Sequence, residues 1–209
     1  MKITFISDTH GQHNALQLPE ADMLVHTGDI SSAGEKWQVR EFLKWMAEQP
    51  HRHKVFIGGN HDFLLEREPL LFHSLIPKGI TYLENTATVI EGIKIWGSPI
   101  TPWFLDWAFN EYRGDLIRRY WERIPEDIDI LLTHGPPLGY GDRTIRGEIV
   151  GCEDLLEFVR RIQPRYHVFG HIHEGYGQYE SEGTSFINAS VLDVRYNLVN
   201  APVTVEYSA

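Results

Sequence analysis

Carboxylate, imidazole and carboxamide side chains recur at the ends of short apolar segments along this chain. Asp8 and His10 directly follow one such segment, residues 3–6, and stand close enough to point at one ion. Asp, His and Gly are also ordinary turn residues, so the recurrence of the pattern carries the inference. The same ending returns further along the chain at Asp29, at Asn60 with His61, at His134, and at His171 with His173. These mixed oxygen and nitrogen donors suit a divalent ion such as Mn, Fe or Zn.

The number of these side chains is enough for a site that holds two metal ions. Such a site needs about seven protein ligands, one of which both ions share. Once His61 is set aside, the chain supplies seven: Asp8, His10, Asp29, Asn60, His134, His171 and His173. Asp29 is the natural shared ligand, because it stands alone on its loop and a carboxylate has two oxygens.

The elements that must position these side chains alternate between strands and helices in the first third of the chain. The apolar pattern predicts strands at 3–6, 21–26 and 54–57, with a helix at 37–46 that Pro50 ends. This rhythm indicates right-handed crossovers and a largely parallel sheet. In such sheets, ligands gather at the carboxyl ends of the strands.

The rest of the chain predicts a second sheet. A helix is expected at 69–76, a hairpin at 86–90 and 93–96, two amphipathic helices around 116–124 and 155–162, and strands at 129–133, 166–169, 184–187 and 203–207. No repeat, low-complexity tract or linker divides the sequence. We therefore expect an α/β fold in which a two-sheet β-sandwich is flanked by helices, formed as a single domain over residues 1–209.

The composition excludes several other classes of protein. The net charge of −10 argues against a long nucleic acid as partner, because such binding needs Lys and Arg to neutralise phosphates. No segment approaches the roughly 18 apolar residues of a membrane span, and no signal peptide is recognisable. The single cysteine, Cys152, fits a reducing compartment, so a cytoplasmic location is expected. The expected partner is a small phosphoester substrate, and the oligomeric state stays open.

We call the short segments that carry the candidate metal ligands the metal-type blocks. They resemble the signature of the calcineurin-like metallophosphoesterase superfamily. That signature runs Asp-x-His, Gly-Asp, Gly-Asn-His-Asp/Glu, His and Gly-His-x-His, and all five blocks occur here in order across residues 8–173. The loop 97–110 and the segment 131–137 further resemble the subgroup called metallophosphoesterase domain-containing proteins. The resemblance implies the calcineurin-like fold and a metal-dependent phosphohydrolase with a dinuclear Mn, Fe or Zn centre.

The resemblance also implies a role for each of these blocks. One ion would take Asp8, His10, Asp29 and His173, and the other would take Asp29, Asn60, His134 and His171. His61 would face the substrate as the catalytic acid, and Asp62 would orient its ring. The ions would activate a metal-bound hydroxide for attack on phosphorus.

The substrate contacts are less closely defined by the sequence. Trp103 and Phe109 in the aromatic loop are candidates for a substrate wall, although a role as core filler is equally compatible with their size. Arg143 follows His134 in a loop and could grip a phosphate. The leading function is a phosphodiesterase on small or cyclic nucleotide-type phosphoesters. The alternatives are a phosphomonoesterase or protein phosphatase, and a catalytically weak regulator that binds metal and nucleotide.

Overall fold

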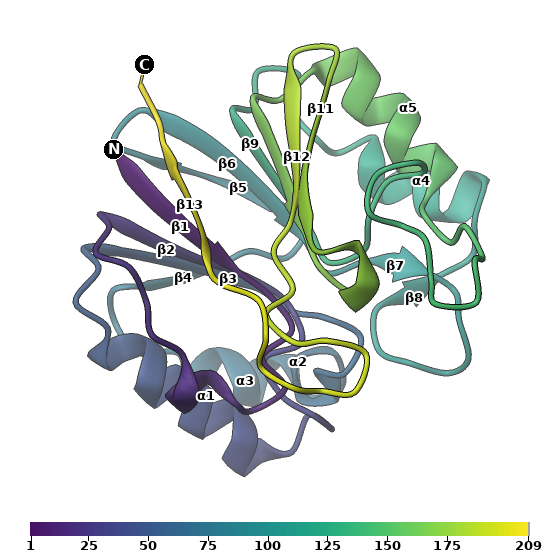
Figure 1. Cartoon of the computed structure of the whole chain (residues 1–209). Helices are drawn as coiled ribbons and strands as arrows, with labels where there is room; N and C mark the ends of the chain where they lie inside the picture. The colour runs from purple at the N-terminus through teal and green to yellow at the C-terminus, as the bar shows by residue number, and fades with distance from the viewer. Residues whose placement is uncertain (209) are drawn as a thin grey trace.

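The computed structural model describes residues 1–208, which form two main β-sheets packed face to face (Figure 1). The first sheet has the order β13-β1-β2-β3-β4, and the second has the order β11-β12-β10-β9-β6-β5. In the first sheet the strands are β1 (Lys2–Ile6), β2 (Met23–Thr27), β3 (His53–Ile57), β4 (Ile80–Tyr82) and β13 (Val203–Glu206). In the second they are β5 (Thr86–Ile90), β6 (Ile93–Ser98), β9 (Ile130–Thr133), β10 (Tyr166–Phe169), β11 (Gly177–Ser181) and β12 (Thr184–Asn188).

The central strands of both sheets run parallel, while antiparallel strands close the edges. β1, β2, β3 and β4 pair in parallel, as do β6, β9, β10 and β12. β13, β5 and β11 each add an antiparallel partner. A short parallel pair, β7 (Thr101–Pro102) and β8 (Asn110–Glu111), lies beside the second sheet.

Helices cover the outer faces of the two sheets. α1 (Lys36–Glu48), α2 (Phe63–Arg67) and α3 (Pro69–Leu75) lie on the first sheet, and α4 (Asp115–Trp121) and α5 (Glu153–Ile162) lie on the second (Figure 1). A capping box between Glu35 and Gln38 starts α1, and Pro69 occupies the first turn of α3. The expected two-sheet sandwich flanked by helices is confirmed.

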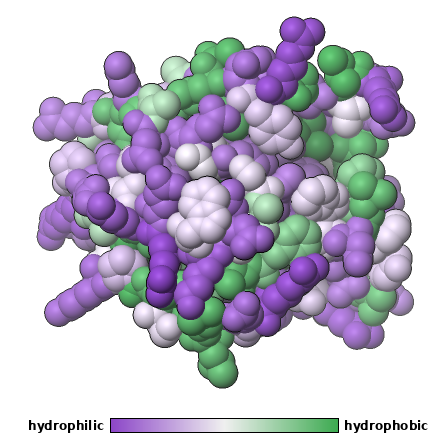
Figure 2. All heavy atoms as spheres, turned by 90° about the horizontal axis from the view of Figure 1, so that it is seen from below, coloured by the Kyte–Doolittle hydropathy of each residue, from purple (hydrophilic) through white to green (hydrophobic). Residues whose placement is uncertain are grey.

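The hydrophobic core has two parts, because successive strand residues face opposite ways. In β2, Met23 and Val25 point into the cluster between the sheets, whereas Leu24 points toward the helices. Phe42 on α1 belongs to this outer cluster, as does Phe158 on α5. On the face seen in Figure 2, hydrophilic side chains dominate and smaller hydrophobic areas interrupt them. Within residues 1–208, no helix is long and apolar enough to cross a membrane.

The structure also contains elements that the sequence pattern did not predict. These are α2, β4, the β7–β8 pair, β11 and the 3-10 turns at His13–Ala15 and His173–Gly175. All are short, and the β7–β8 pair lies almost entirely within the segment 97–110, which was expected to be a loop. β4, β7, β8 and the two 3-10 turns have two or three residues each, too few for a hydrophobic period to show. β11 has five residues, but Tyr179 is its one large apolar side chain.

Candidate metal centre

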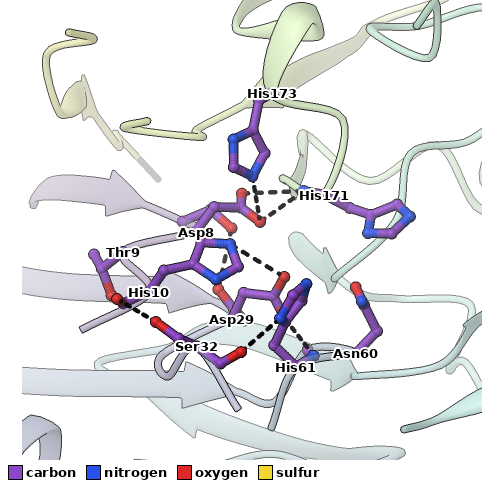
Figure 3. A network of polar contacts seen from close by, with 12 residues as sticks. Asp8, Thr9, His10, Asp29, Ser32, Asn60, His61, His171 and His173 are labelled. Atoms are coloured by element: carbon purple, nitrogen blue, oxygen red, sulfur yellow. Dashed lines mark hydrogen bonds and ion pairs between the residues drawn. The ribbon is translucent and has the colours of Figure 1, made fainter. Parts of the chain in front are cut away.

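Five loops at the carboxyl ends of parallel strands meet at one edge of the two sheets. β1, β2 and β3 deliver their loops from the first sheet, and β9 and β10 deliver theirs from the second. Backbone hydrogen bonds join the loops: Asp8 N–H donates to Gly28 O at 3.0 Å, and Gly170 N–H donates to His134 O at 2.9 Å. The side chains of Asp8, His10 and Asp29 thereby come together with those of His171 and His173 (Figure 3).

The backbone at this edge adopts conformations that ordinary residues avoid. Asp8, His10, Asp29 and His171 have φ angles of 55°, 42°, 56° and 66°. Such left-handed conformations cost on the order of 1–3 kcal/mol each and persist only where the surroundings enforce them. Gly59 is required for a different reason, since a Cβ there would collide with the backbone nitrogen and carboxylate of Asp29. The edge that gathers the donor atoms therefore combines local backbone strain with close loop packing.

The donor atoms form three overlapping groups. Within each group, the candidate ligand atoms lie within 4.8 Å of one another. The groups are Asp8–His10–His173, His10–Asp29–His61 and Asp29–His134–His171. Asn60 adds its carboxamide oxygen, which lies 2.9 Å from His134 Nε2. His10 and Asp29 each belong to two groups, and Asp29 is the carboxylate of that pair.

The imidazole of His10 has the environment expected of a metal ligand. Both ring nitrogens are buried and have no hydrogen-bond partner among the described residues. Burial lowers the pKa of His10 to about 4, against the opposing pull of the Asp29 and Asp8 carboxylates. The ring is therefore neutral near pH 7, although its Nε2 lies 3.5 Å from Asp29 Oδ2. A cation between these atoms would satisfy both, so the residues fit a bound metal ion.

The pKa of His134 shifts in the opposite direction to that of His10. The His134 Nδ1–H donates to Thr27 O at 2.9 Å, which directs Nε2 at Asn60 and at Asp29 Oδ2, 3.3 Å away. Burial alone would lower its pKa, but the Asp29 and Asp8 carboxylates outweigh that effect and raise the pKa to about 9. A proton on Nε2 thus occupies the position between oxygen donors that a metal ion would take. Metal binding there must release this proton.

Asp8 is fixed by groups from the far end of the chain. The Ser190 hydroxyl donates to its Oδ2, and the His171 N–H lies 3.0 Å from both carboxylate oxygens. His173 is oriented in turn because its Nδ1–H donates to Asp193 O at 2.9 Å, leaving Nε2 to face Asp8. Ser190 and Asp193 belong to the segment between β12 and β13, which contains no recognisable motif.

His61 occupies the mouth of the site. Its Nδ1 lies 2.8 Å from the carbonyl oxygen of Ser32, so Nδ1 carries a proton and donates it (Figure 3). Nε2 is left as the ring atom that can hold or release a proton toward a substrate. The backbone N–H of His61 donates to Asp29 Oδ1 at 2.8 Å, which couples its position to that of the shared carboxylate.

The expected contact between Asp62 and the His61 ring is wrong. The fully buried Asp62 carboxylate instead accepts hydrogen bonds from Ile30 N, Ser31 N, Ser31 Oγ and Gly59 N at 2.7–3.2 Å. Asp62 directly precedes α2, and its carboxylate faces inward, toward the loop that carries Asp29. Burial, with the nearby Asp29 charge, raises its pKa to about 6. Asp62 therefore ties the Asp29 loop to the Asn60 loop and does not orient the imidazole.

A hollow of about 360 Å³ opens above the donor atoms. Its walls come from His10, Asp29, Asn60, His61, His171 and His173, together with Phe104, Trp107, Glu174, Val194 and Tyr196. Trp107 and Tyr196 were missed by the sequence analysis. Tyr196 packs edge-on against the His10 ring at a centroid distance of 4.8 Å. We call this hollow the metal pocket.

The three candidate substrate contacts lie in different parts of the structure. Phe109 is only 4% exposed and packs beneath Gly58, so it belongs to the core and not to the substrate wall. Arg143 lines a separate hollow and donates to Gly147 O, so it does not face the metal pocket. Trp103 is 49% exposed and borders a hollow next to the metal pocket.

The two strand histidines outside the ligand set are buried supports. His26 Nδ1 accepts from Gly28 N–H at 3.2 Å, and its Nε2 lies 3.0 Å from Thr9 Oγ1. His167 Nε2 lies 2.8 Å from Thr133 Oγ1, directly before the ligand candidate His134. Burial lowers the pKa of each to about 3, so both are neutral. They position the loops that carry the donors.

Comparison with known proteins agrees with this geometry. Residues 1–175 match the family model described as calcineurin-like phosphoesterase. The chain is 38% identical to human metallophosphoesterase domain-containing protein 1 over 96% of this chain and 69% of that protein. It is 39% identical to a UPF0046 protein of Caenorhabditis elegans, over 97% of this chain and 59% of the relative.

The fold is shared with more distant proteins of known structure. The phosphopantetheinyl hydrolase of Mycobacterium tuberculosis superposes with a TM-score of 0.68 at 16% identity, covering 93% of this chain and 90% of that one. At this identity the likeness concerns the fold alone. With the family match over most of its length and a donor set suited to divalent ions, the chain belongs to the calcineurin-like phosphoesterase family and is a metal-dependent phosphoesterase.

Proposed function

We propose that the protein is a phosphodiesterase for small phosphoesters, including those of nucleotide type, and that it works with two divalent ions such as Mn, Fe or Zn. The observation that carries this proposal is the overlap of the donor groups at Asp29, which offers one carboxylate to two sets of nitrogen ligands. Asp8, His10, Asp29 and His173 would hold one ion. Asp29, Asn60, His134 and His171 would hold the other.

The chain's own residues divide the remaining chemical tasks. When bound, the ions supply Lewis acidity that polarises phosphoryl oxygens and lowers the pKa of water. His61 holds a proton at Nε2, close to the metal pocket, and gives it to the departing oxygen. Ser32 and Trp107 keep the ring in place while it does so.

The size of the metal pocket favours a small substrate. About 360 Å³ lies at the low end of the range for small-molecule sites, and Phe104, Trp107 and Tyr196 border the opening. A phosphoprotein substrate would need a broad groove on either side of the phosphate. The pocket therefore supports a small phosphoester over a phosphopeptide.

Turnover of bis(p-nitrophenyl) phosphate and p-nitrophenyl phosphate tests the proposal. The protein should be stripped with a chelator and reloaded with Mn, Zn or Fe in separate samples. We expect turnover of the diester that disappears with the chelator and returns with metal. Faster turnover of the monoester would favour a phosphomonoesterase, and metal binding without turnover of either compound would favour a regulator.

A further inference from the structure

A second hollow adjoins the metal pocket. It has a volume of about 340 Å³, and His171 and Phe104 border both hollows. The other walls are mostly apolar: Pro102, Trp103, Pro136, Val150 and Ile172. Because His171 belongs to the donor groups, a molecule bound at the metal pocket can extend directly into this space. We call it the arm pocket.

The aromatic wall of the arm pocket is held rigidly. The Trp103 indole stacks on the Tyr112 ring, with centroids 5.5 Å apart and planes 13° apart. The backbone N–H of Trp103 donates to Glu111 O at 2.8 Å. The Asn110 side chain closes the turn that follows by donating to Phe104 O at 3.0 Å. A flat apolar group would therefore meet a preformed surface, and little ordering would be required on binding.

The wall of the arm pocket that contains Val150 is held in place by Arg113, which also lines the pocket. The Arg113 guanidinium donates to Gly151 O at 2.8 Å and to Val150 O at 2.7 Å. Glu148 lines the hollow as well and carries the opposite charge to Arg113. The arm pocket therefore offers no net charge that would attract a second anionic group.

The positions of His61 and His171 decide which part of a substrate lies there. His61 serves the departing oxygen from its place in the metal pocket, and the arm pocket begins at His171. The side chains of His61 and His171 lie apart from each other in the site (Figure 3). The group expelled from phosphorus then lies beside His61. The second ester group of a diester, which stays on phosphorus, lies beside His171.

We propose that the arm pocket binds the uncharged aromatic ester group that remains on phosphorus, so that the preferred substrate is a phosphodiester with one flat apolar arm. This inference rests on the proposed phosphodiesterase function and specifies its substrate class. A phosphomonoester has no such arm and leaves the pocket without a ligand. Trp103 is the specificity-determining residue, because its exposed indole provides the stacking surface.

The test uses the Mn-loaded protein and three compounds that all release p-nitrophenolate: phenyl p-nitrophenyl phosphate, methyl p-nitrophenyl phosphate and p-nitrophenyl phosphate. The wild-type kcat/KM should favour the phenyl over the methyl diester by roughly 5- to 150-fold, the value of one stacking contact. Trp103→Ala should bring this ratio close to one and leave the methyl diester and the monoester within about twofold of wild type. The matched control is Leu105→Ala, an exposed residue of the same turn outside the arm pocket, which should keep the wild-type ratio.

Binding of inert anions gives a readout that is independent of turnover. Diphenylphosphinate and dimethylphosphinate carry the same charge and have no ester bond to break. Calorimetry should show tighter binding of the diphenyl compound to wild type, and Trp103→Ala should remove that preference. A preference that survives in Trp103→Ala, or an equal loss on every compound, would overturn the inference. Absence of diester turnover with the binding preference intact would instead count against the phosphodiesterase function alone.

Discussion

The imidazole of His61 lies against the indole of Trp107, with ring centroids 4.2 Å apart and planes 34° apart. Trp107 is itself stacked on Phe63 at 5.7 Å. The carbonyl of Ser32 holds the His61 ring at its edge, through Nδ1. The ring is thus fixed on one face and at one nitrogen, and only Nε2 is left to act on a substrate.

Removing the Trp107 indole should displace the His61 imidazole from its position while leaving His61 itself in the chain. We expect Trp107→Ala to lower kcat by roughly 10- to 100-fold with little change in KM, because small displacements of a catalytic group are costly. Trp107→Phe should recover most of the loss, since a flat surface is retained. Steady-state kinetics on bis(p-nitrophenyl) phosphate measures both. Trp37→Ala, which removes an exposed indole on α1, is the control. A raised KM with unchanged kcat would make Trp107 a substrate contact.

His61→Ala tests the role of the ring itself. Metal content should stay close to wild type, while kcat should fall by on the order of 10²–10⁴, the usual contribution of a general acid. The loss should be smaller for a p-nitrophenyl ester, whose leaving group needs little protonation, than for an alkyl ester. Rates on both esters and metal analysis provide the measurement.

His61 also lies within one of the donor groups, together with His10 and Asp29. Loss of a metal ion in His61→Ala would therefore make His61 a ligand. Equal slowing of both esters would make it a phosphate clamp. His73→Ala, an exposed histidine on α3, should match wild type in both measurements.

The hydrogen bonds of Asp62 predict a structural effect. In Asp62→Asn, the new NH2 group would face backbone N–H donors, and charge-assisted hydrogen bonds would be lost. We expect the free energy of unfolding to fall by about 3 kcal/mol. Metal affinity should fall with it, because the Asp29 and Asn60 loops would separate. Urea unfolding and metal titration measure these effects, with the exposed Asp106→Asn as control. If Asp62→Asn were as stable as wild type but slower in turnover, Asp62 would act by orienting the His61 ring after all.

The sequence predicted the main architecture and the gathering of the donors because both follow from local patterns. Strand periodicity placed β1, β2 and β3, and parallel pairing brings their carboxyl ends to one edge. The role of Asp62 could not be predicted from local sequence patterns. Whether its carboxylate faces the His61 ring or the Ile30 backbone depends on how two loops pack, and that is a property of tertiary structure.

The missed residues of the site share a similar cause. Tyr196 and Ser190 lie far from the metal-type blocks in sequence, and neither stands at a recognisable motif. Phe109 and Trp107 are two residues apart in one aromatic loop, yet one is buried in the core and the other covers His61. The aromatic composition of the loop was equally compatible with a substrate wall and with core packing, and only the fold of the turn decides which ring faces the metal pocket.

His167 should make stability fall in mild acid. Burial lowers its pKa from the ordinary 6.5 to about 3, so below pH 6.5 the unfolded chain binds a proton that the folded chain rejects. Stability is therefore full above this value and declines as the pH falls. Between pH 7 and pH 5 this single group should cost about 2 kcal/mol.

Urea unfolding at the two pH values, with a chelator present, measures the effect. The decline should be smaller in His167→Gln, which cannot titrate, than in wild type. His73→Gln should decline as wild type does, because that side chain is exposed. An identical decline in wild type and His167→Gln would mean that the buried ring accepts its proton without cost.

In the proposed site, Asp29 joins two metal ions. The number of Mn ions bound per chain by wild type and by Asp29→Ala, determined on folded protein after removal of free metal, tests this directly. We expect about two ions in wild type and fewer than one in Asp29→Ala, with loss of diester turnover. Two ions in Asp29→Ala, or a single ion in wild type, would contradict it.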